Sequence, residues 1–125
     1  MENDVGRLSA SFFFLSESHC EACWKPLVDV YRCANGWLVK FDLAGVRGED
    51  VQVIAQGRRL TVRGIRRDWL IHEGHEAYSL EISYNRFERT LELPVELERA
   101  EIAGQFREGM FLVTVSIKEN EHDRY

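Results

Sequence analysis

Hydrophobic and polar residues alternate along most of the chain from Pro26 onward. A period of two is typical of β-strands, because successive side chains point to opposite faces of a sheet. Glycine-containing turns separate the alternating segments, and the Asn35-Gly36 pair is typical of a two-residue hairpin loop. Many short strands of this kind predict an all-β fold, an antiparallel sandwich or barrel. The predicted strands lie around residues 28–31, 37–43, 51–55, 60–62, 78–84, 87–93, 102–106 and 111–117.

The first part of the chain differs in character from the rest. It is rich in serine and glutamate and contains one aromatic cluster, Phe12-Phe13-Phe14-Leu15. Its apolar residues recur at a spacing that fits a short amphipathic helix, and a flexible tail is the alternative. We therefore expect an N-terminal segment at 1–25, a β-domain at 26–118 and a charged C-terminal tail at 119–125.

Composition narrows the possible functions. The chain has 125 residues, of which 45% are hydrophobic and 30% charged, as expected for one globular domain. Its net charge of −5 argues against a nucleic-acid partner, since phosphate binding depends on Lys and Arg. No apolar run approaches the ~20 residues of a membrane span, so we expect no membrane partner. The N-terminus lacks the basic start and long apolar stretch of a signal peptide. We expect a cytoplasmic protein.

A series of short motifs follows in a fixed order between Pro26 and Lys118. They are PLVDVY at 26–31, FDLAGV at 41–46, LTVRG at 60–64, YNRFER at 84–89, LP at 93–94 and GMFLV at 109–113. Together they resemble the α-crystallin domain of small heat shock proteins. Ala44 stands where that family has a turn proline, and Asn85 where it has a glycine. The resemblance implies an antiparallel, immunoglobulin-like β-sandwich.

The resemblance also implies a function. It indicates an ATP-independent holdase chaperone that binds unfolding client proteins and suppresses their aggregation. The chain has no G-x-x-x-x-G-K-[ST] phosphate loop and no G-x-S-x-G elbow, so we predict neither an enzyme nor a cofactor. Exposed apolar surface is typical of binding sites, and the predicted client-binding residues are Phe12, Phe13, Phe14 and Leu15.

The connection from Ile65 to Ser83 is too long for a hairpin loop of ~2–5 residues. In the family such a connection lends a strand to a partner subunit, which predicts a homodimer. No I-x-I motif, which builds large family assemblies, follows Lys118, so we expect a dimer or a small oligomer. The resemblance places Arg89 at the dimer interface. The other predicted interface residues are Trp69, Leu70, Ile71, Tyr78, Leu80, Val28 and Val30.

Two alternatives to a holdase remain open from the sequence. One is a p23-like co-chaperone or protein-interaction module, which would not need the long connection. The other is a thiol- or zinc-regulated binding protein that uses the C-x-x-C pair Cys20 and Cys23, with His19 and Cys33 as further ligands.

Two further clusters are weaker candidates for chemistry. The HEGHE run at 72–76 offers metal ligands without the H-E-x-x-H spacing, and a solvated loop is the simpler interpretation. A basic cluster at 58–67 lies near Trp69, with Glu73, Glu76 and Glu81 as its expected counter-charges.

Overall fold

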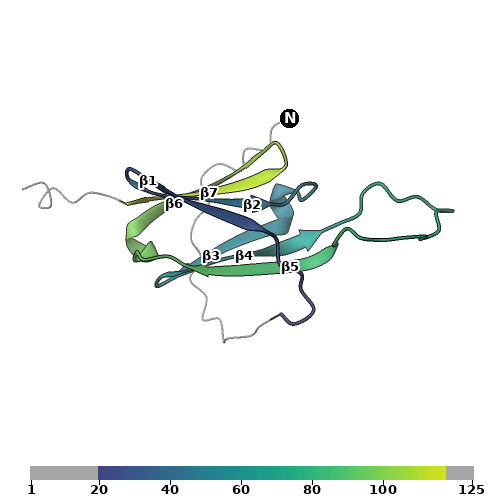
Figure 1. Cartoon of the computed structure of the whole chain (residues 1–125), viewed down its shortest axis with the longest axis horizontal. Coiled ribbons are helices and arrows are strands. Elements are labelled where there is room, and N and C mark those ends of the chain that lie inside the picture. The colour runs from purple at the N-terminus through teal and green to yellow at the C-terminus, as the bar shows by residue number, and fades with distance from the viewer. Residues whose placement is uncertain (1–19, 118–125) are drawn as a thin grey trace, which may run out of the picture.

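A computed structural model describes residues 20–117 and shows two antiparallel β-sheets packed face to face (Figure 1). One sheet has the strand order β1-β2-β7-β6 and the other the order β3-β4-β5. The predicted antiparallel sandwich is confirmed. The strands are β1 (Val28–Cys33), β2 (Gly36–Asp42), β3 (Val51–Gln56), β4 (Arg59–Arg66), β5 (Asn85–Glu92), β6 (Ala100–Arg107) and β7 (Met110–Ile117). The predictions for Phe12–Leu15 and for the C-terminal tail lie outside the described residues.

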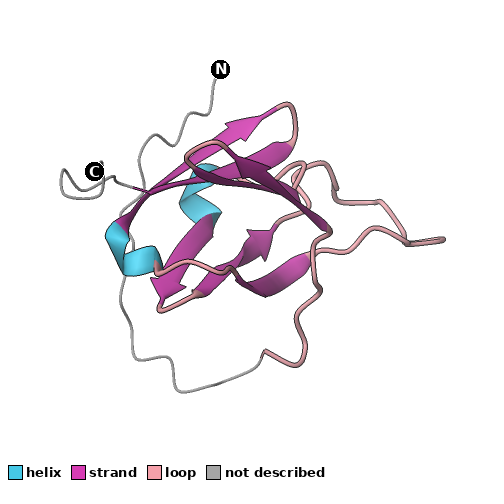
Figure 2. Ribbon diagram, turned by 60° about the vertical axis from the view of Figure 1, so that its left-hand side comes forward, coloured by secondary structure: helices cyan, strands magenta, loops and turns pink. Residues whose placement is uncertain are grey.

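The core lies between the two sheets and follows the predicted alternation. In β2, Val39 and Phe41 are fully buried, and Leu43 continues the row just after the strand. The Phe41 ring lies 6.4 Å from that of Phe111 in β7. Two 3-10 turns, η1 (Gly48–Asp50) and η2 (Leu97–Arg99), connect strands that belong to different sheets (Figure 2).

The first hairpin forms, but its turn lies one residue earlier than predicted. Cys33 pairs with Gly36, so Ala34 and Asn35 form the loop and Gly36 begins β2. Gly36 is needed for a different reason: a Cβ atom there would collide with the backbone carbonyl of Val115 in the neighbouring β7. Close approach of two backbones and a positive φ of 155° therefore both select glycine at this position.

The predicted strand at 78–84 is absent from the described subunit. Residues 67–84 instead form a long excursion between β4 and β5, which we call the arm and which projects from one end of the sandwich (Figure 1). β4 and β5 pair directly, down to Arg66 opposite Asn85, and among residues 20–117 no strand pairs with the arm. Asn85 has a left-handed backbone (φ 73°), a conformation that both glycine and asparagine tolerate. This explains why asparagine can stand here, where the family that the sequence resembles has glycine.

Candidate functional site

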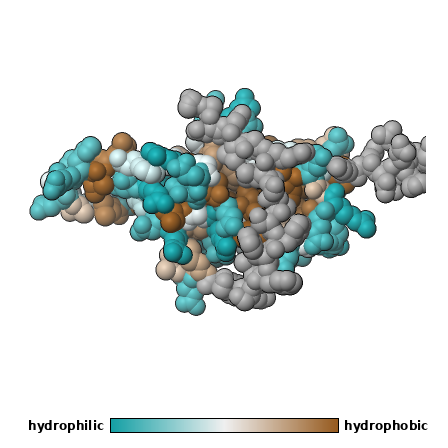
Figure 3. Space-filling view, turned by 180° about the vertical axis from the view of Figure 1, so that it is seen from behind, coloured by the Kyte–Doolittle hydropathy of each residue, from teal (hydrophilic) through white to brown (hydrophobic). Residues whose placement is uncertain are grey.

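Most of the apolar side chains of the arm face solvent. Tyr78 is fully exposed, Leu70 is 82% exposed and Leu80 is 79% exposed. Charged residues such as Glu73, Glu76 and Glu81 lie between and beside these apolar residues, so the surface of the arm is a mixture of apolar and polar patches (Figure 3). Ile71 is also exposed, and Trp69 is partly covered because the Arg47 guanidinium lies 3.3 Å from the centre of its ring. Exposed apolar groups of this kind indicate a surface that is covered when a partner is bound.

The base of the arm is fixed to the sandwich by Arg66. Its Nε donates a hydrogen bond to the carbonyl oxygen of Ala44 (3.0 Å), and its Nη1 donates one to that of Ser83 (2.9 Å). The same guanidinium lies 4.5 Å from the ring centre of Trp24. Arg66 thus joins both limbs of the arm to the turn after β2 and to the segment before β1.

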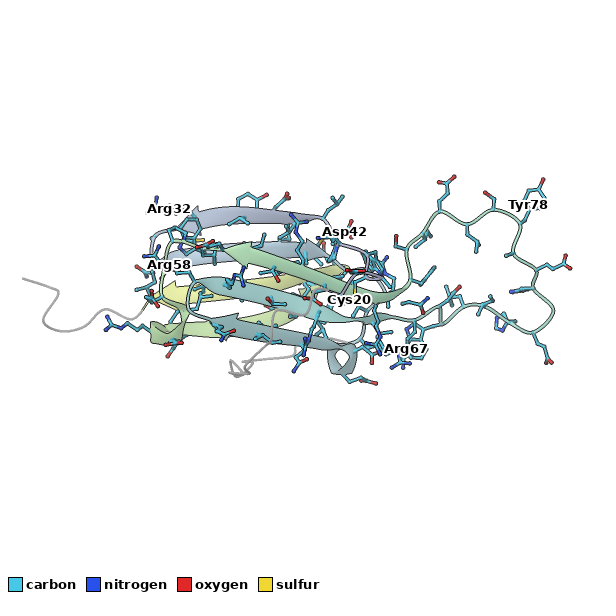
Figure 4. All side chains as sticks on the ribbon, turned by 90° about the horizontal axis from the view of Figure 1, so that it is seen from below. Cys20, Arg32, Asp42, Arg58, Arg67 and Tyr78 are labelled. Carbon is cyan, nitrogen blue, oxygen red and sulfur yellow. A yellow bond between two sulfur atoms is a disulfide. The ribbon has the colours of Figure 1, made fainter. Side chains whose placement is uncertain are left out.

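Arg67 and Asp50 form a second attachment of the arm. The guanidinium donates two hydrogen bonds to the carboxylate, from Nε to Oδ2 (3.0 Å) and from Nη2 to Oδ1 (3.1 Å) (Figure 4). These hydrogen bonds hold the pKa of the Asp50 carboxyl below its ordinary value, against the opposing effect of its burial. The counter-charges predicted from the sequence were wrong. Arg67 pairs with Asp50 and Arg58 with Glu96, at 3.6 Å, rather than with Glu73, Glu76 or Glu81.

Asp50→Asn should destabilise the protein in a pH-dependent way. A carboxyl whose pKa is lowered by folding stabilises the native state above its unfolded pKa of ~3.9, and this stabilisation is lost as the pH falls through the folded pKa. We expect the variant to lose about 1 kcal/mol of unfolding free energy at pH 7. Urea unfolding between pH 7 and pH 3 should show the two proteins converging at the acid end. A constant difference across this range would contradict the assignment.

The outer edge of β1 offers a second candidate surface. β1 pairs with β2 on one side and, within residues 20–117, with no strand on the other. Val30 and Tyr31 are exposed along it, whereas Val28 is half-buried and packs against the core. An unpaired strand edge presents backbone donors and acceptors to another strand.

The segment before β1 covers the outer edge of β5. The amide of Trp24 donates to the carbonyl oxygen of Arg86 (3.1 Å), and the amide of Glu88 donates to that of Trp24 (3.1 Å). The Trp24 and Phe87 ring centres lie 5.4 Å apart. Next along the strand, Nη1 of Arg89 donates to the carbonyl oxygen of buried Pro26 (2.8 Å). Arg89 therefore secures the approach to β1 within its own subunit.

This bridge also brings the C-x-x-C pair to β5. Cys20 and Cys23 form a disulfide, and their sulfur atoms lie with a carboxylate oxygen of Glu88 in one group whose members are all within 4.8 Å of one another. No sequence pattern indicates Glu88, because only the pairing of Trp24 with Phe87 brings its side chain to the two cysteines. Cys33, proposed as a further ligand, is an exposed thiol at the end of β1 and is not in the group, and His19 lies outside the described residues.

The HEGHE run forms a turn within the arm. The amide of His72 donates to Nδ1 of His75 (3.1 Å), and the amide of His75 donates to the carbonyl oxygen of His72 (3.0 Å). Nδ1 of His75 is thereby occupied. In the described part of the chain, neither histidine belongs to a group of three potential metal ligands.

Comparison with known proteins identifies the family. The model of the Hsp20/alpha crystallin family matches residues 29–125. The chain belongs to this family. Among its curated members, heat shock protein 16 of Schizosaccharomyces pombe is 31% identical over 93 residues, which are 72% of this chain and 64% of that protein. Small heat shock protein C2 of Rickettsia felis is 22% identical over 99 residues, 79% of this chain and 64% of that protein. The chain thus spans less than two thirds of the length of these two Hsp20 relatives.

Solved structures from the Hsp20 family share the sandwich. Heat shock protein 16.0 of Schizosaccharomyces pombe aligns with a TM-score of 0.63 at 27% identity, covering 80% of this chain and 78% of the other. HspA of Xanthomonas axonopodis aligns with a TM-score of 0.65 at 25% identity, covering 78% and 97%. The predicted resemblance to small heat shock proteins is confirmed. Among residues 20–117, no helix is long and apolar enough to cross a membrane.

Proposed function

We propose that the chain is an ATP-independent holdase chaperone, which binds unfolding proteins and keeps them from aggregating. The observation that carries the proposal is the set of exposed apolar side chains on the arm of an Hsp20-family sandwich. A client that buries a few of its own apolar side chains on such a surface gains ~1.5–3 kcal/mol for each. This affinity needs neither a fixed client sequence nor energy from a nucleotide.

The proposed client surface has two parts. The arm supplies Leu70 and Ile71, which are exposed and adjacent, with charged Glu73 close by in the sequence. The aromatic cluster Phe12–Leu15 is the second part and is proposed from its sequence alone. The net charge of −5 favours proteins over nucleic acids as partners, and we propose that the chain acts in the cytoplasm.

We further propose a homodimer that forms by exchange of strands. Tyr78, Leu80 and Ile82 alternate with polar residues, as in a strand, yet pair with no strand in the described part of their own subunit. The outer edge of β1 has backbone groups available for pairing. The arm of one subunit would add a strand to β1 of the other, and the reciprocal contact would close a two-fold dimer. Arg89 would contribute by holding Pro26, and thus the start of β1, in place.

The holdase proposal predicts protection without nucleotide. A heat-labile enzyme warmed with an equimolar amount of the protein should scatter less light than the enzyme alone, and ATP should not change the result. An inert protein of similar size and charge serves as the control for crowding. Unchanged aggregation at several-fold molar excess would refute the proposal.

A further inference from the structure

Two cysteines from the segment before β1 and a glutamate from β5 form a cluster of potential metal ligands on the outer side of the β3-β4-β5 sheet. The sulfur atoms of Cys20 and Cys23 and a carboxylate oxygen of Glu88 lie within 4.8 Å of one another, and all three residues are half-buried. Among residues 20–117, no other group of three or more His, Cys, Asp or Glu residues meets this criterion. The cluster depends on the two backbone hydrogen bonds that hold Trp24 against β5.

We propose that the reduced form of this cluster binds a Zn²⁺ ion through the two thiolates and the Glu88 carboxylate. Tetrahedral zinc has Zn–S bonds of ~2.3 Å and Zn–O bonds of ~2.0–2.2 Å, so its ligand atoms are separated by about 3.3–3.8 Å. The Glu88 oxygen lies within 4.8 Å of both sulfurs, which are bonded to each other in the structure. After reduction the two sulfurs must move apart to reach this range, and the carboxylate has only a short distance to close. A C-x-x-C pair is a common half of a zinc site.

The three candidate ligands line a pocket that leaves space for a fourth ligand. Cys20, Cys23 and Glu88 line a pocket of about 800 Å³, which has room for a water molecule on the metal (Figure 4 shows Cys20 in front of the sheet). Arg63 and Arg86 line the same pocket, and Arg63 lies opposite Glu88 in the register of β4 and β5. Two thiolates and one carboxylate carry one more negative charge than Zn²⁺ neutralises, and these guanidinium groups offset the excess.

Metal binding and the disulfide exclude each other. The two sulfurs are bonded to each other in the structure, so the site opens only when a thiol or phosphine reductant supplies two electrons; two protons from the thiol or from water complete the two thiols and leave an oxidised reductant. Zinc then replaces the two thiol protons, which are released to solvent, and two Zn–S bonds form. The bound ion would fasten the segment around Cys23 to β5 in addition to the Trp24 bridge.

Cobalt titration of the reduced full-length chain tests the site. In the presence of a phosphine reductant, one equivalent of Co²⁺ should give the near-ultraviolet absorption of a thiolate–cobalt bond, and Zn²⁺ should abolish it. Cys20→Ser and Cys23→Ser should each remove this absorption, and Glu88→Gln should weaken binding by about tenfold or more. Cys33→Ser is the matched control and should bind as the unmodified chain does.

Several results would overturn the site. In the first, the reduced protein forms no one-to-one complex with cobalt; in the second, the Cys20 and Cys23 variants keep the thiolate–cobalt absorption. The others are that Cys33→Ser loses that absorption, or that Glu88→Gln binds cobalt with unchanged affinity. X-ray absorption of the zinc-loaded, unmodified chain gives an answer that does not depend on the variants. It should show two sulfur neighbours at ~2.3 Å, and a shell without sulfur would refute the proposal. The aggregation assay on the same variants tests the chaperone function separately.

Discussion

Replacing residues 70–81 with a short Gly-Ser linker should convert the proposed dimer into a monomer. The change removes Tyr78 and Leu80, which are exposed and which no strand within residues 20–117 pairs with. It keeps the contacts of Arg66 and Arg67 that fix the base of the arm. Loss of both reciprocal strand pairings removes most of the proposed interface, so the dimer dissociation constant should rise on the order of 100-fold or more.

Size-exclusion chromatography with light scattering, over a range of concentrations, measures this change. Thermal unfolding should show that the shortened sandwich itself remains folded and nearly as stable as that of the unmodified chain, since the removed residues lie outside the core. Glu76→Gln changes the charge of the arm without shortening it and is the matched control. A shortened protein that dimerises with unchanged affinity would show that another surface holds the subunits together.

Gly64→Ala should cause a large loss of stability. A Cβ atom at Gly64 would collide with the backbone carbonyl of Asp50 and lie 2.9 Å from Cζ of Phe87, a ring that is almost fully buried. Neither group can move freely, because one is backbone and the other belongs to the core. Overpacking of this kind costs about 2–3 kcal/mol. For a domain of this size the melting temperature should fall by roughly 10–15 °C.

Gly74→Ala is the matched control for that substitution. Gly74 lies in the arm, where an added Cβ atom has no neighbour within 4 Å. Its positive φ of 96° makes alanine unfavourable locally, but the arm can adjust without disturbing the core. Differential scanning calorimetry should show a lower melting temperature for Gly64→Ala alone. Equal melting temperatures would mean that β4 can shift away from Asp50 at little cost.

The strands of the sandwich could be predicted because each has one face in the core. Val53 in β3 and Val62 in β4 are buried on the same face and lie opposite each other, as period-two patterning requires. The same pattern failed at Tyr78, because alternation shows which residues suit a strand but not whether a neighbouring strand is present. The turn at Asn35-Gly36 lies one residue earlier than predicted because Gly36 is the first residue of β2, where its contact with β7 and its positive φ both select glycine.

The candidate site could be predicted only in part. The apolar residues of the arm were recognised because they interrupt a charged stretch, and they are exposed as a binding surface requires. The partner of Arg67 was missed because Asp50 lies 17 residues earlier, in the η1 turn that the fold brings to the end of β4. Glu88 was missed for a similar reason, since nothing in its local sequence links it to Cys20 or Cys23.

The most direct test of the chaperone proposal is to recover the client after heating. A heat-labile enzyme is warmed with the protein in the absence of nucleotide, cooled and separated by size-exclusion chromatography with light scattering. The proposal predicts that the client remains in solution and elutes with the protein as a complex larger than either component. If the client is lost to the pellet while the protein elutes alone at its unheated mass, the holdase proposal is contradicted.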